Sequence, residues 1–359
     1  MIPLYNVFMP NEALSGISDV LASGKLAYGE HTKIFEKKLQ AFVGNKNILA
    51  ISSNPVFFAL KLIDINEGDE VIVSPMSCLM TTQPIAYTGA KVVWADIDPE
   101  TGSLDPEDVK NKITSKTKAI IHYHWAGYPG YISEINALAK KHGIYVIEDA
   151  TESFGAEYDG KKIGNNGTDI VCYSFTPVRL PNAIDGGGIA LKNEKLFQRA
   201  LLMRDLGVDR SNFRDPLGEI NQECNIITTG DSAALNNVSG YVGASQIKYL
   251  DELYRKQRVN ATKWEEYFKN INNVKLLNNR KNTKPSYWAF NILSDNRDEL
   301  LKEFRAKGFY ASKMHLRNDL YSVFKSSAKE FNGVNEFANK QLNLPCGWWV
   351  APEDIYNKC

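Results

Sequence analysis

Short apolar runs alternate with amphipathic stretches of helical length through residues 48–200, and this alternation limits the fold more than any other feature. Runs such as "AIIHYH" and "IYVIED" are bounded by turn residues and contain several β-branched residues, so they predict buried strands. Strands buried on both faces are typical of parallel sheets, because crossover helices cover both sides. The sequence therefore predicts an α/β fold whose three layers enclose a mostly parallel sheet.

The pattern changes near residue 245. A long amphipathic helical stretch, "ASQIKYLDELYRKQRVNATKWEEYFKNI", is followed by "SYWAFNIL", the helical stretch "RDELLKEFRAKG" and the final "NLPCGWWVAPEDI". These mixed elements predict a smaller C-terminal α+β domain. We therefore divide the chain into a large domain at 1–245, which includes an N-terminal arm, and a small domain at 246–359.

Composition and charge exclude several classes of partner. Lys+Arg and Asp+Glu both number 42, so the zero net charge offers no broad basic face for nucleic acid. The five cysteines show no CxxC spacing, which predicts reduced thiols and no metal site. No stretch is long and apolar enough for a membrane span, and the N-terminus lacks a signal-peptide pattern. We expect a cytoplasmic protein with no nucleic-acid or membrane partner.

The stretch 172–188, "CYSFTPVRLPNAIDGGG", joins a predicted strand to three glycines through a short loop that contains Arg179. An arginine stays protonated at neutral pH, so Arg179 is a poor nucleophile and a poor general base. Its guanidinium suits a carboxylate or a phosphate, which makes this loop a candidate anion site. A structural ion pair of Arg179 with Asp149 or Glu152 is the alternative.

Several segments, in order along the chain, resemble the DegT/StrS-type nucleotide-sugar aminotransferases. They include "LASGKLAYGEHTKIFEKKLQAFVG", "GAKVVWADIDPETGSLDPEDVKNKITSKTKAII", "AKKHGIYVIEDATESFGAEYDGKKIG" and "LNNVSGYVGASQI". The resemblance covers nearly the whole chain and implies the pyridoxal-phosphate (PLP) fold type I, that of aspartate aminotransferase. It also implies a homodimer with its active site at the subunit interface.

This resemblance further implies transfer of an amino group from glutamate to a nucleotide-linked 4-keto-6-deoxy sugar. A minority of the family uses the aminated cofactor (PMP) for dehydration at C3 of the sugar, with a histidine in place of the catalytic lysine. In this sequence that lysine position is Arg179, and no lysine occurs between Lys162 and Lys192. Arginine cannot form the internal Schiff base. His124, at the end of "AIIHYH", is the second candidate catalytic residue, with core packing as its alternative.

The family's phosphate-binding turn aligns with residues 53–56. At this turn the cofactor phosphate would contact Ser53, Asn54 and Pro55. The proline lacks both the hydroxyl and the N–H that the family's residue supplies. Capping of a helix by Ser53 or Asn54, with Pro55 in the first turn, is the alternative. Ser174 retains the family's other phosphate contact.

Three positions around the cofactor ring are assigned by the same resemblance. Asp149 would pair with the protonated pyridine nitrogen, and a helix-capping or solvent-facing aspartate is the alternative. Leu79 stands where the family has a ring-stacking aromatic residue. Glu152 replaces a glutamine, and its negative charge would oppose the ring oxygen.

His315, Arg317 and Asn318 match a motif that would face the nucleotide sugar, and Arg317 could pair with a diphosphate. A solvated helix end is the alternative for Arg317. The segment that the partner subunit contributes in the family includes Ser232 and Asn236, and Asn236 could instead cap a helix.

The departures at Pro55, Leu79, Glu152, Arg179 and Ser232 together predict a pocket without a cofactor, with PLP or PMP as the alternative. Three functions follow. The first is a nucleotide-sugar-modifying protein of surface-polysaccharide (O-antigen) biosynthesis that acts on a nucleotide-diphospho-sugar without a PLP internal aldimine. The second is a PLP- or PMP-dependent aminotransferase or 3-dehydratase. The third is a catalytically silent partner of an intact paralogue. The sequence leaves enzymatic activity open.

Overall fold

The computed structural model describes residues 1–324 and 330–358. Its centre is a seven-stranded sheet with the order β1-β11-β10-β7-β6-β2-β3. The neighbouring strands from β10 to β3 pair in parallel, whereas β11 pairs antiparallel with both β10 and β1. The predicted mostly parallel sheet is confirmed. Its strands are β1 (Ile48–Ile51), β2 (Glu70–Val73), β3 (Lys91–Trp94), β6 (Thr117–Tyr123), β7 (Tyr145–Asp149), β10 (Ile170–Ser174) and β11 (Gly187–Leu191).

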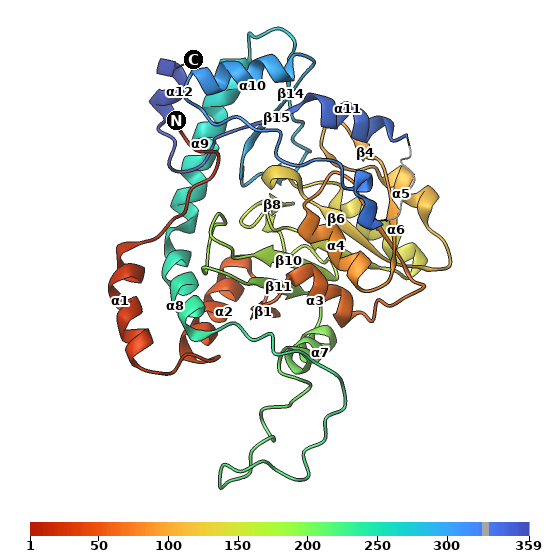
Figure 1. The fold of residues 1–359 in the computed structure, drawn as a ribbon, viewed down its shortest axis with the longest axis vertical. Coiled ribbons are helices and arrows are strands. Elements are labelled where there is room, and N and C mark those ends of the chain that lie inside the picture. Colours follow the sequence, from red (N-terminus) through yellow and green to blue (C-terminus); the bar gives the residue numbers. More distant parts are fainter. Residues whose placement is uncertain (325–329, 359) are drawn as a thin grey trace.

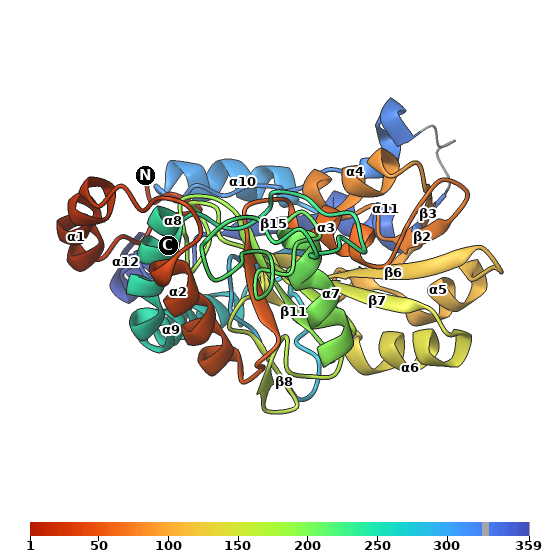
Figure 2. The same cartoon turned by 90° about the horizontal axis from the view of Figure 1, so that it is seen from below.

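Alternate side chains of these strands enter two different cores. In β1, Leu49 and Ile51 pack on one face with helices α3 (Pro55–Leu62), α4 (Leu79–Tyr87) and α7 (Glu194–Arg204). Ile48 and Ala50 pack on the other face, which is covered by α2 (Glu30–Val43), α6 (Ile132–His142) and α8 (Asn237–Gln246), with α5 (Pro106–Lys112) beside α6. Figure 2 shows the sheet between α3 and α4 on one side and α5 and α6 on the other. The period-two alternation of a strand therefore produces the three layers.

The C-terminal part forms a separate sheet with the order β12-β14-β15. Helix α9 (Leu250–Phe268) connects it to the large sheet (Figure 1). Trp264 of this helix stacks with Phe268 and Phe290 and meets Phe304 edge-to-face. The domain boundary at residue 245 stays a prediction. The remaining elements of this part are β12 (Val274–Leu276), β14 (Phe290–Ser294), α10 (Arg297–Ala306), α11 (Asn332–Lys340), β15 (Gln341–Leu344) and α12 (Pro352–Lys358).

Small ribbons join the two parts of the chain. Strand β13 (Thr283–Lys284) pairs with β8 (Glu157–Tyr158), which pairs with β9 (Lys161–Lys162). A further hairpin consists of β4 (Ile97–Asp98) and β5 (Ser103–Leu104). Before α1 (Asn11–Ala22), the N-terminal arm pairs Ile2 with Phe309 of the C-terminal part. The arm therefore crosses from one part of the molecule to the other.

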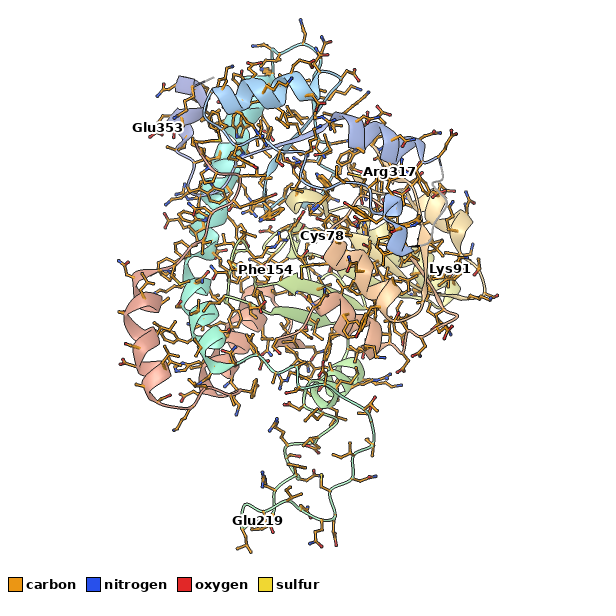
Figure 3. The ribbon with its side chains drawn as sticks, in the orientation of Figure 1. Cys78, Lys91, Phe154, Glu219, Arg317 and Glu353 are labelled. Carbon is orange, nitrogen blue, oxygen red and sulfur yellow. The ribbon has the colours of Figure 1, made fainter. Side chains whose placement is uncertain are left out.

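A long loop between α7 and α8, residues 205–236, projects from the body of the molecule (Figure 1). Glu219 lies near its far end (Figure 3), and Leu217 and Ile227 on the same loop expose apolar side chains. Within residues 1–324 and 330–358, none of the helices has the length and apolar character needed to cross a membrane.

Candidate functional site

The carboxyl ends of three parallel strands bring polar side chains to one edge of the large sheet. Tyr123 ends β6, Asp149 ends β7 and Ser174 ends β10. Tyr123 lies opposite Asp149 in the strand register, and Cys172 of β10 lies opposite Asp149 on the other side. In open α/β sheets, the crevice outside this edge is where ligands bind. The sheet therefore places a candidate site at Asp149.

Asp149 is a buried carboxylate without a positive partner. Its Oδ2 accepts a 2.6 Å hydrogen bond from the Thr81 hydroxyl, and its Oδ1 accepts one of 3.1 Å from the Thr151 N–H. No basic side chain within residues 1–324 and 330–358 forms an ion pair with it. Burial raises the pKa of Asp149 above its usual value, despite these hydrogen bonds. A carboxylate of this kind has room for a cationic group of a ligand.

Glu152 is buried one turn further on, at the centre of a small polar cluster. Its Oε2 accepts a hydrogen bond of 3.0 Å from the Ala126 N–H, and its Oε1 lies 3.1 Å from His315 Nε2. Burial acts to raise the pKa of Glu152, but the hydrogen bond and charge of His315, together with the charge of Arg179, hold it below its usual value. Glu152 is therefore ionised at neutral pH although its side chain is fully buried.

Arg179 faces this cluster from the loop between β10 and β11. Its Nη1 lies 3.7 Å from Glu152 Oε1, a charge contact that is too long for a hydrogen bond. Its guanidinium stacks on the Trp288 ring at 4.1 Å, and Trp288 also stacks with Tyr5 of the N-terminal arm at 4.0 Å. The structure thus confirms the ion-pair interpretation for Glu152 and not for Asp149.

Three buried donors around Trp288 have no hydrogen-bond partner among the residues that the structure describes. They are Nε and Nη1 of Arg179 and the hydroxyl of Tyr5. Unpaired buried polar groups are uncommon in folded proteins, because each forfeits its hydrogen bonds to water. These unused donors, two of them on the Arg179 guanidinium itself, are suited to a ligand that carries hydrogen-bond acceptors. Sequence reasoning missed Tyr5, Tyr123 and Trp288, and the aromatic pair in "SYWAF" was the only available signal for Trp288.

The turn before α3 is closed by a side chain. Asn54 caps the helix, since its Oδ1 accepts hydrogen bonds from the N–H groups of Val56 at 2.8 Å and Phe57 at 3.1 Å. Pro55 occupies the first helical position, so the capping interpretation is confirmed. The Ser53 hydroxyl is buried and has no partner in the described part of the chain.

Leu79 and Ser174 lie near this turn. Leu79 begins α4 and lines a hollow of about 350 Å³ together with Asn54, Phe57 and Met80. The Ser174 hydroxyl lies 3.0 Å from the hydroxyl of Thr176, which leaves it free to take another partner. The turn and the start of α4 therefore line one hollow, and Thr81 of α4 connects this helix to Asp149.

His124 lies outside this cluster. Its Nε2 is 3.0 Å from Glu148 Oε2, its Nδ1 accepts a hydrogen bond of 3.2 Å from the Gly130 N–H, and its ring is fully buried. Both ring nitrogens are thus used within the protein, and the structure favours the core interpretation over a catalytic one.

Of the C-terminal motif His315, Arg317 and Asn318, only part belongs to the cluster around Glu152. His315 belongs to the cluster, whereas the Arg317 guanidinium pairs with Asp319 and also contacts Asn335. Asn318 anchors the segment on α4 through the Ser77 carbonyl and the Thr82 hydroxyl, both at 3.0 Å.

The two positions near α8 are not part of the cluster either. Asn236 caps α8 by accepting a 2.8 Å hydrogen bond from the Ser239 N–H, as its alternative interpretation predicted. Ser232 is exposed and bridges to Asp205 at the base of the projecting loop.

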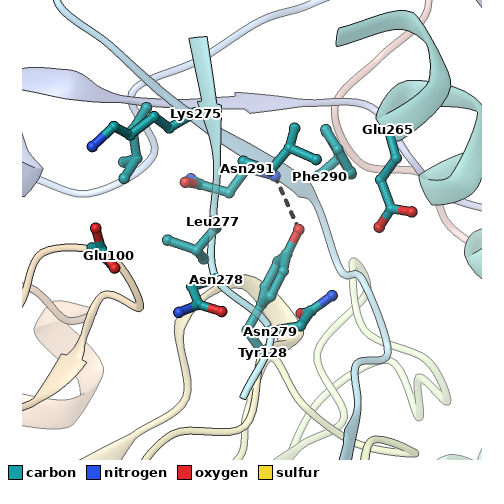
Figure 4. Close-up of a pocket in the computed structure, with 11 residues that line it drawn as sticks. Glu100, Tyr128, Glu265, Lys275, Leu277, Asn278, Asn279, Phe290 and Asn291 are labelled. Carbon is teal, nitrogen blue, oxygen red and sulfur yellow. Dashed lines mark hydrogen bonds between the residues drawn. The ribbon is translucent and has the colours of Figure 1, made fainter. Parts of the chain in front are cut away.

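A second hollow, of about 470 Å³, lies between the two parts of the chain (Figure 4). Glu100 and Tyr128 line it from the large part, and Glu265, Lys275 and Asn291 line it from the C-terminal part. The Asn291 N–H donates a hydrogen bond of 3.3 Å to the Tyr128 hydroxyl. None of the residues singled out in the sequence lies here.

Comparisons with known proteins give one consistent result. A model of the DegT/DnrJ/EryC1/StrS aminotransferase family matches residues 9–357. The sugar aminotransferase CalS13 from Micromonospora echinospora has a TM-score of 0.93 at 26% identity, over 99% of this chain and 97% of that one. AtS13 from Actinomadura melliaura has a TM-score of 0.92 at 28% identity, over 99% of this chain and 96% of that one. Spr1654 from Streptococcus pneumoniae, solved in a PMP-form, shares the fold with a TM-score of 0.88 at 18% identity, over 99% and 95%.

These findings contradict the prediction of a pocket without a cofactor. The matching family consists of aminotransferases, and Spr1654 has been solved both in a PMP-form and in a PLP-form. The prediction was wrong because it counted the lost contacts at Pro55, Leu79 and Arg179 and gave too little weight to Asp149. Asp149 is buried and forms no ion pair within residues 1–324 and 330–358, so its carboxylate is suited to a positively charged group of a ligand.

Proposed function

The chain belongs to the DegT/DnrJ/EryC1/StrS aminotransferase family, and on this premise we propose that it modifies a nucleotide-linked sugar with PLP or PMP held without a covalent bond. The observation that carries this proposal is the pairing of a retained Asp149 with an arginine at the lysine position. Asp149 is buried and lacks a positive partner among the described residues, so it fits a protonated pyridine ring. Arg179 cannot form a Schiff base with the aldehyde of PLP.

The residues present fit the ring end of the cofactor better than the phosphate end. Asp149 would hold the ring nitrogen and Leu79 would cover the ring. The hydroxyls of Ser53 and Ser174 would donate to the phosphate. The Ser53 hydroxyl has no partner within the described residues, and the Ser174 oxygen accepts a long hydrogen bond of 3.4 Å from the Thr176 N–H. The N–H groups of Val56 and Phe57 are already taken by Asn54. We therefore expect weaker cofactor retention than a fully open phosphate turn would give.

When bound, PLP or PMP supplies an aldehyde or amine and an aromatic ring that can accept an electron pair from the neighbouring carbon. Asp149 would hold the ring nitrogen in its protonated form, because an ionised carboxylate stabilises an adjacent cation. Arg179 keeps a fixed positive charge beside Glu152 and offers donors to an anionic group of the ligand. The stack of Arg179, Trp288 and Tyr5 excludes water from this side of the site.

The family and the C-terminal segment support a nucleotide-linked sugar as the substrate class. CalS13, which is 26% identical, is a sugar aminotransferase. His315 reaches the cluster from the C-terminal part, so a ligand in the crevice would contact both parts of the chain. We propose a nucleotide-diphospho-sugar of surface-polysaccharide biosynthesis as substrate, in the cytoplasm. The projecting loop 205–236, with its exposed Leu217 and Ile227, supports a homodimer as the working form.

Titration of the purified protein with PLP and with PMP tests this proposal, with tryptophan fluorescence as the readout because Trp288 lies in the cluster. We expect saturable binding of both, release on dialysis, and no covalent adduct after borohydride treatment in the presence of PLP. The variant Arg179→Lys is the matched control and should yield an adduct on that residue by mass spectrometry. No saturable binding of either compound would overturn the proposal, and so would an adduct on the unmodified protein.

The substrate is tested separately, by thermal unfolding with nucleotide-linked 4-keto-6-deoxy sugars in the presence of PMP. We expect a rise in the unfolding temperature with the nucleotide sugar that exceeds the rise with the free nucleotide. Equal rises would show that the sugar makes no contact with the site.

A further inference from the structure

His315 is held in one orientation by contacts on three sides. Its Nε2 lies 3.1 Å from Glu152 Oε1 and 3.2 Å from the Tyr123 hydroxyl. The edge of the imidazole meets the Trp125 ring at a centroid distance of 5.6 Å and an angle of 85°. These contacts come from β6, from the 3-10 helix Trp125–Gly127 that follows it, and from the turn after β7, all in the large part of the chain. The ring is therefore fixed although its backbone belongs to the C-terminal part.

The partner at Nε2 decides which ring nitrogen is free. Oε1 of the buried Glu152 lies 3.1 Å from Nε2, and an ionised carboxylate can only accept, so Nε2 is the ring nitrogen that carries a proton. A histidine whose one nitrogen donates to a carboxylate presents the lone pair of the other. Nδ1 of His315 forms no hydrogen bond with the part of the chain that the structure describes, and the side chain is 19% exposed. Nδ1 is therefore an accessible proton acceptor.

The neighbouring groups are poor candidates for the same task. Arg179 stays protonated and cannot accept a proton at neutral pH. Burial raises the pKa of the Tyr123 and Tyr5 hydroxyls well above the usual value, and burial raises the pKa of the Cys78 thiol. Each of these three groups is consequently neutral and weakly basic at neutral pH. Among the described residues of the cluster, His315 offers an imidazole nitrogen without a hydrogen bond, and an imidazole is the usual proton carrier of enzyme sites.

We propose that His315 is the proton-carrying catalytic residue of this site and that Glu152 is the positioning residue that orients it. This inference rests on the proposed function. Nδ1 would take up the proton from the carbon that bears the amino group: the C–H bond would break, its electron pair would stay with that carbon, and an N–H bond would form at Nδ1. The cofactor would supply the ring that stabilises this electron pair. The return of that proton reverses the step. No oxidant or reductant is consumed.

Exchange of the α-hydrogen of L-glutamate with deuterated buffer, in the presence of PLP, measures this step directly. Proton magnetic resonance follows the loss of the α-hydrogen signal. We expect the unmodified protein to exchange it and His315→Ala to do so about 10²-fold more slowly, the lower end of what a general base contributes. His142→Ala is the matched control, because His142 is exposed at the end of α6, and should exchange like the unmodified protein.

Added imidazole separates a chemical role from a structural one. Imidazole should restore exchange to His315→Ala in proportion to its concentration, since it replaces the missing base. It should not accelerate Glu152→Gln, whose histidine is present but less well oriented, and which should exchange several-fold more slowly than the unmodified protein. Thermal unfolding of each variant checks that it is folded, and His315→Gln replaces His315→Ala if the latter is not.

PLP binding by fluorescence distinguishes the two ways in which the experiment can fail. If the unmodified protein does not bind PLP, the proposed function fails and this inference fails with it. If it binds PLP and His315→Ala exchanges as fast as the unmodified protein, the proposed function stands and the role of His315 is refuted. Binding without any exchange by the unmodified protein refutes that role as well.

Discussion

Two histidine–glutamate pairs lie in the large sheet region, and they differ in what surrounds them. His124 and Glu148 are 3.0 Å apart and both side chains are fully buried. His315 and Glu152 are 3.1 Å apart, and the glutamate is equally buried. In the first pair Nδ1 of the histidine accepts a hydrogen bond from the Gly130 N–H. In the second pair Nδ1 forms no hydrogen bond within residues 1–324 and 330–358. The same two side chains therefore form a closed contact in one place and, in our proposal, a base in the other.

The partners of each glutamate explain the difference. Glu148 also accepts from the Thr168 hydroxyl and lies within reach of the Asn166 amide, so its pair is enclosed by neutral groups of the core. Glu152 shares its charge between His315 and Arg179 at the edge of the sheet. A histidine in a fully satisfied network stabilises the fold, whereas one with an open nitrogen at a strand end can exchange a proton with a ligand.

Removal of Glu148 should have the largest effect on stability. Glu148→Ala leaves His124 and the Thr168 hydroxyl without their buried partner, so we expect the free energy of unfolding to fall by about 3–5 kcal/mol. Urea unfolding measures this change. Glu134→Ala, which removes the partly exposed ion pair with Arg280, is the control and should cost less than about 1 kcal/mol. An equal loss in both variants would show that the closed pair is not a structural element.

Asp149→Asn should weaken PMP binding about 10- to 100-fold, since a charged hydrogen bond contributes about 1.5–3 kcal/mol. The same change should raise stability without cofactor. Because burial raises the pKa of Asp149 in the folded protein, its ionised form is penalised there at neutral pH, and stability is gained as the pH falls through that pKa. Fluorescence titration and urea unfolding check the two effects. A variant that binds PMP normally would exclude the role of Asp149 at the ring nitrogen.

Glu152→Gln should lower stability at neutral pH by about 1–2 kcal/mol, through loss of the charge shared with His315 and Arg179. The pKa of Glu152 is lower in the folded protein than in the unfolded chain. Glu152 therefore contributes fully to the free energy of unfolding when the pH is above its pKa in the unfolded chain, about 4.3. This contribution is lost as the pH falls through its pKa in the folded protein. Unfolding of both proteins across this acid range should show the difference shrinking. Glu157→Gln, at a surface ion pair with Lys284, should show little difference at any pH.

Asn54→Ala should have the smallest effect, a loss of about 1 kcal/mol in stability from removal of the helix cap. It also frees the N–H groups of Val56 and Phe57, so PMP should bind as tightly as before or more tightly. Asn193→Ala removes the equivalent cap of α7 and should lose similar stability with no change in PMP binding. Weaker PMP binding by Asn54→Ala alone would mean that Asn54 itself contacts the cofactor.

Local features were predictable because they depend on neighbouring residues. The cap of α3 follows from Asn54 and Pro55 being adjacent in the chain. The parallel sheet follows from the spacing of apolar runs between helices. The cofactor prediction failed because it combined the departures from the family pattern and gave too little weight to Asp149. No pattern in the sequence showed that Asp149 would be buried without a cation or that Tyr5 would stack on Trp288.

The sequence by itself determined the fold class, the family resemblance and the exclusion of a Schiff base at Arg179, because these depend on residue type and spacing. Only the tertiary structure decided which histidine is available for chemistry. His124 stood beside the expected pocket in the sequence, yet packing encloses it against Glu148. His315 meets Glu152 across a separation of 163 residues. That contact exists because the C-terminal part folds back onto the strand ends, and the charge and hydrogen bonding of a side chain depend on what packing brings beside it.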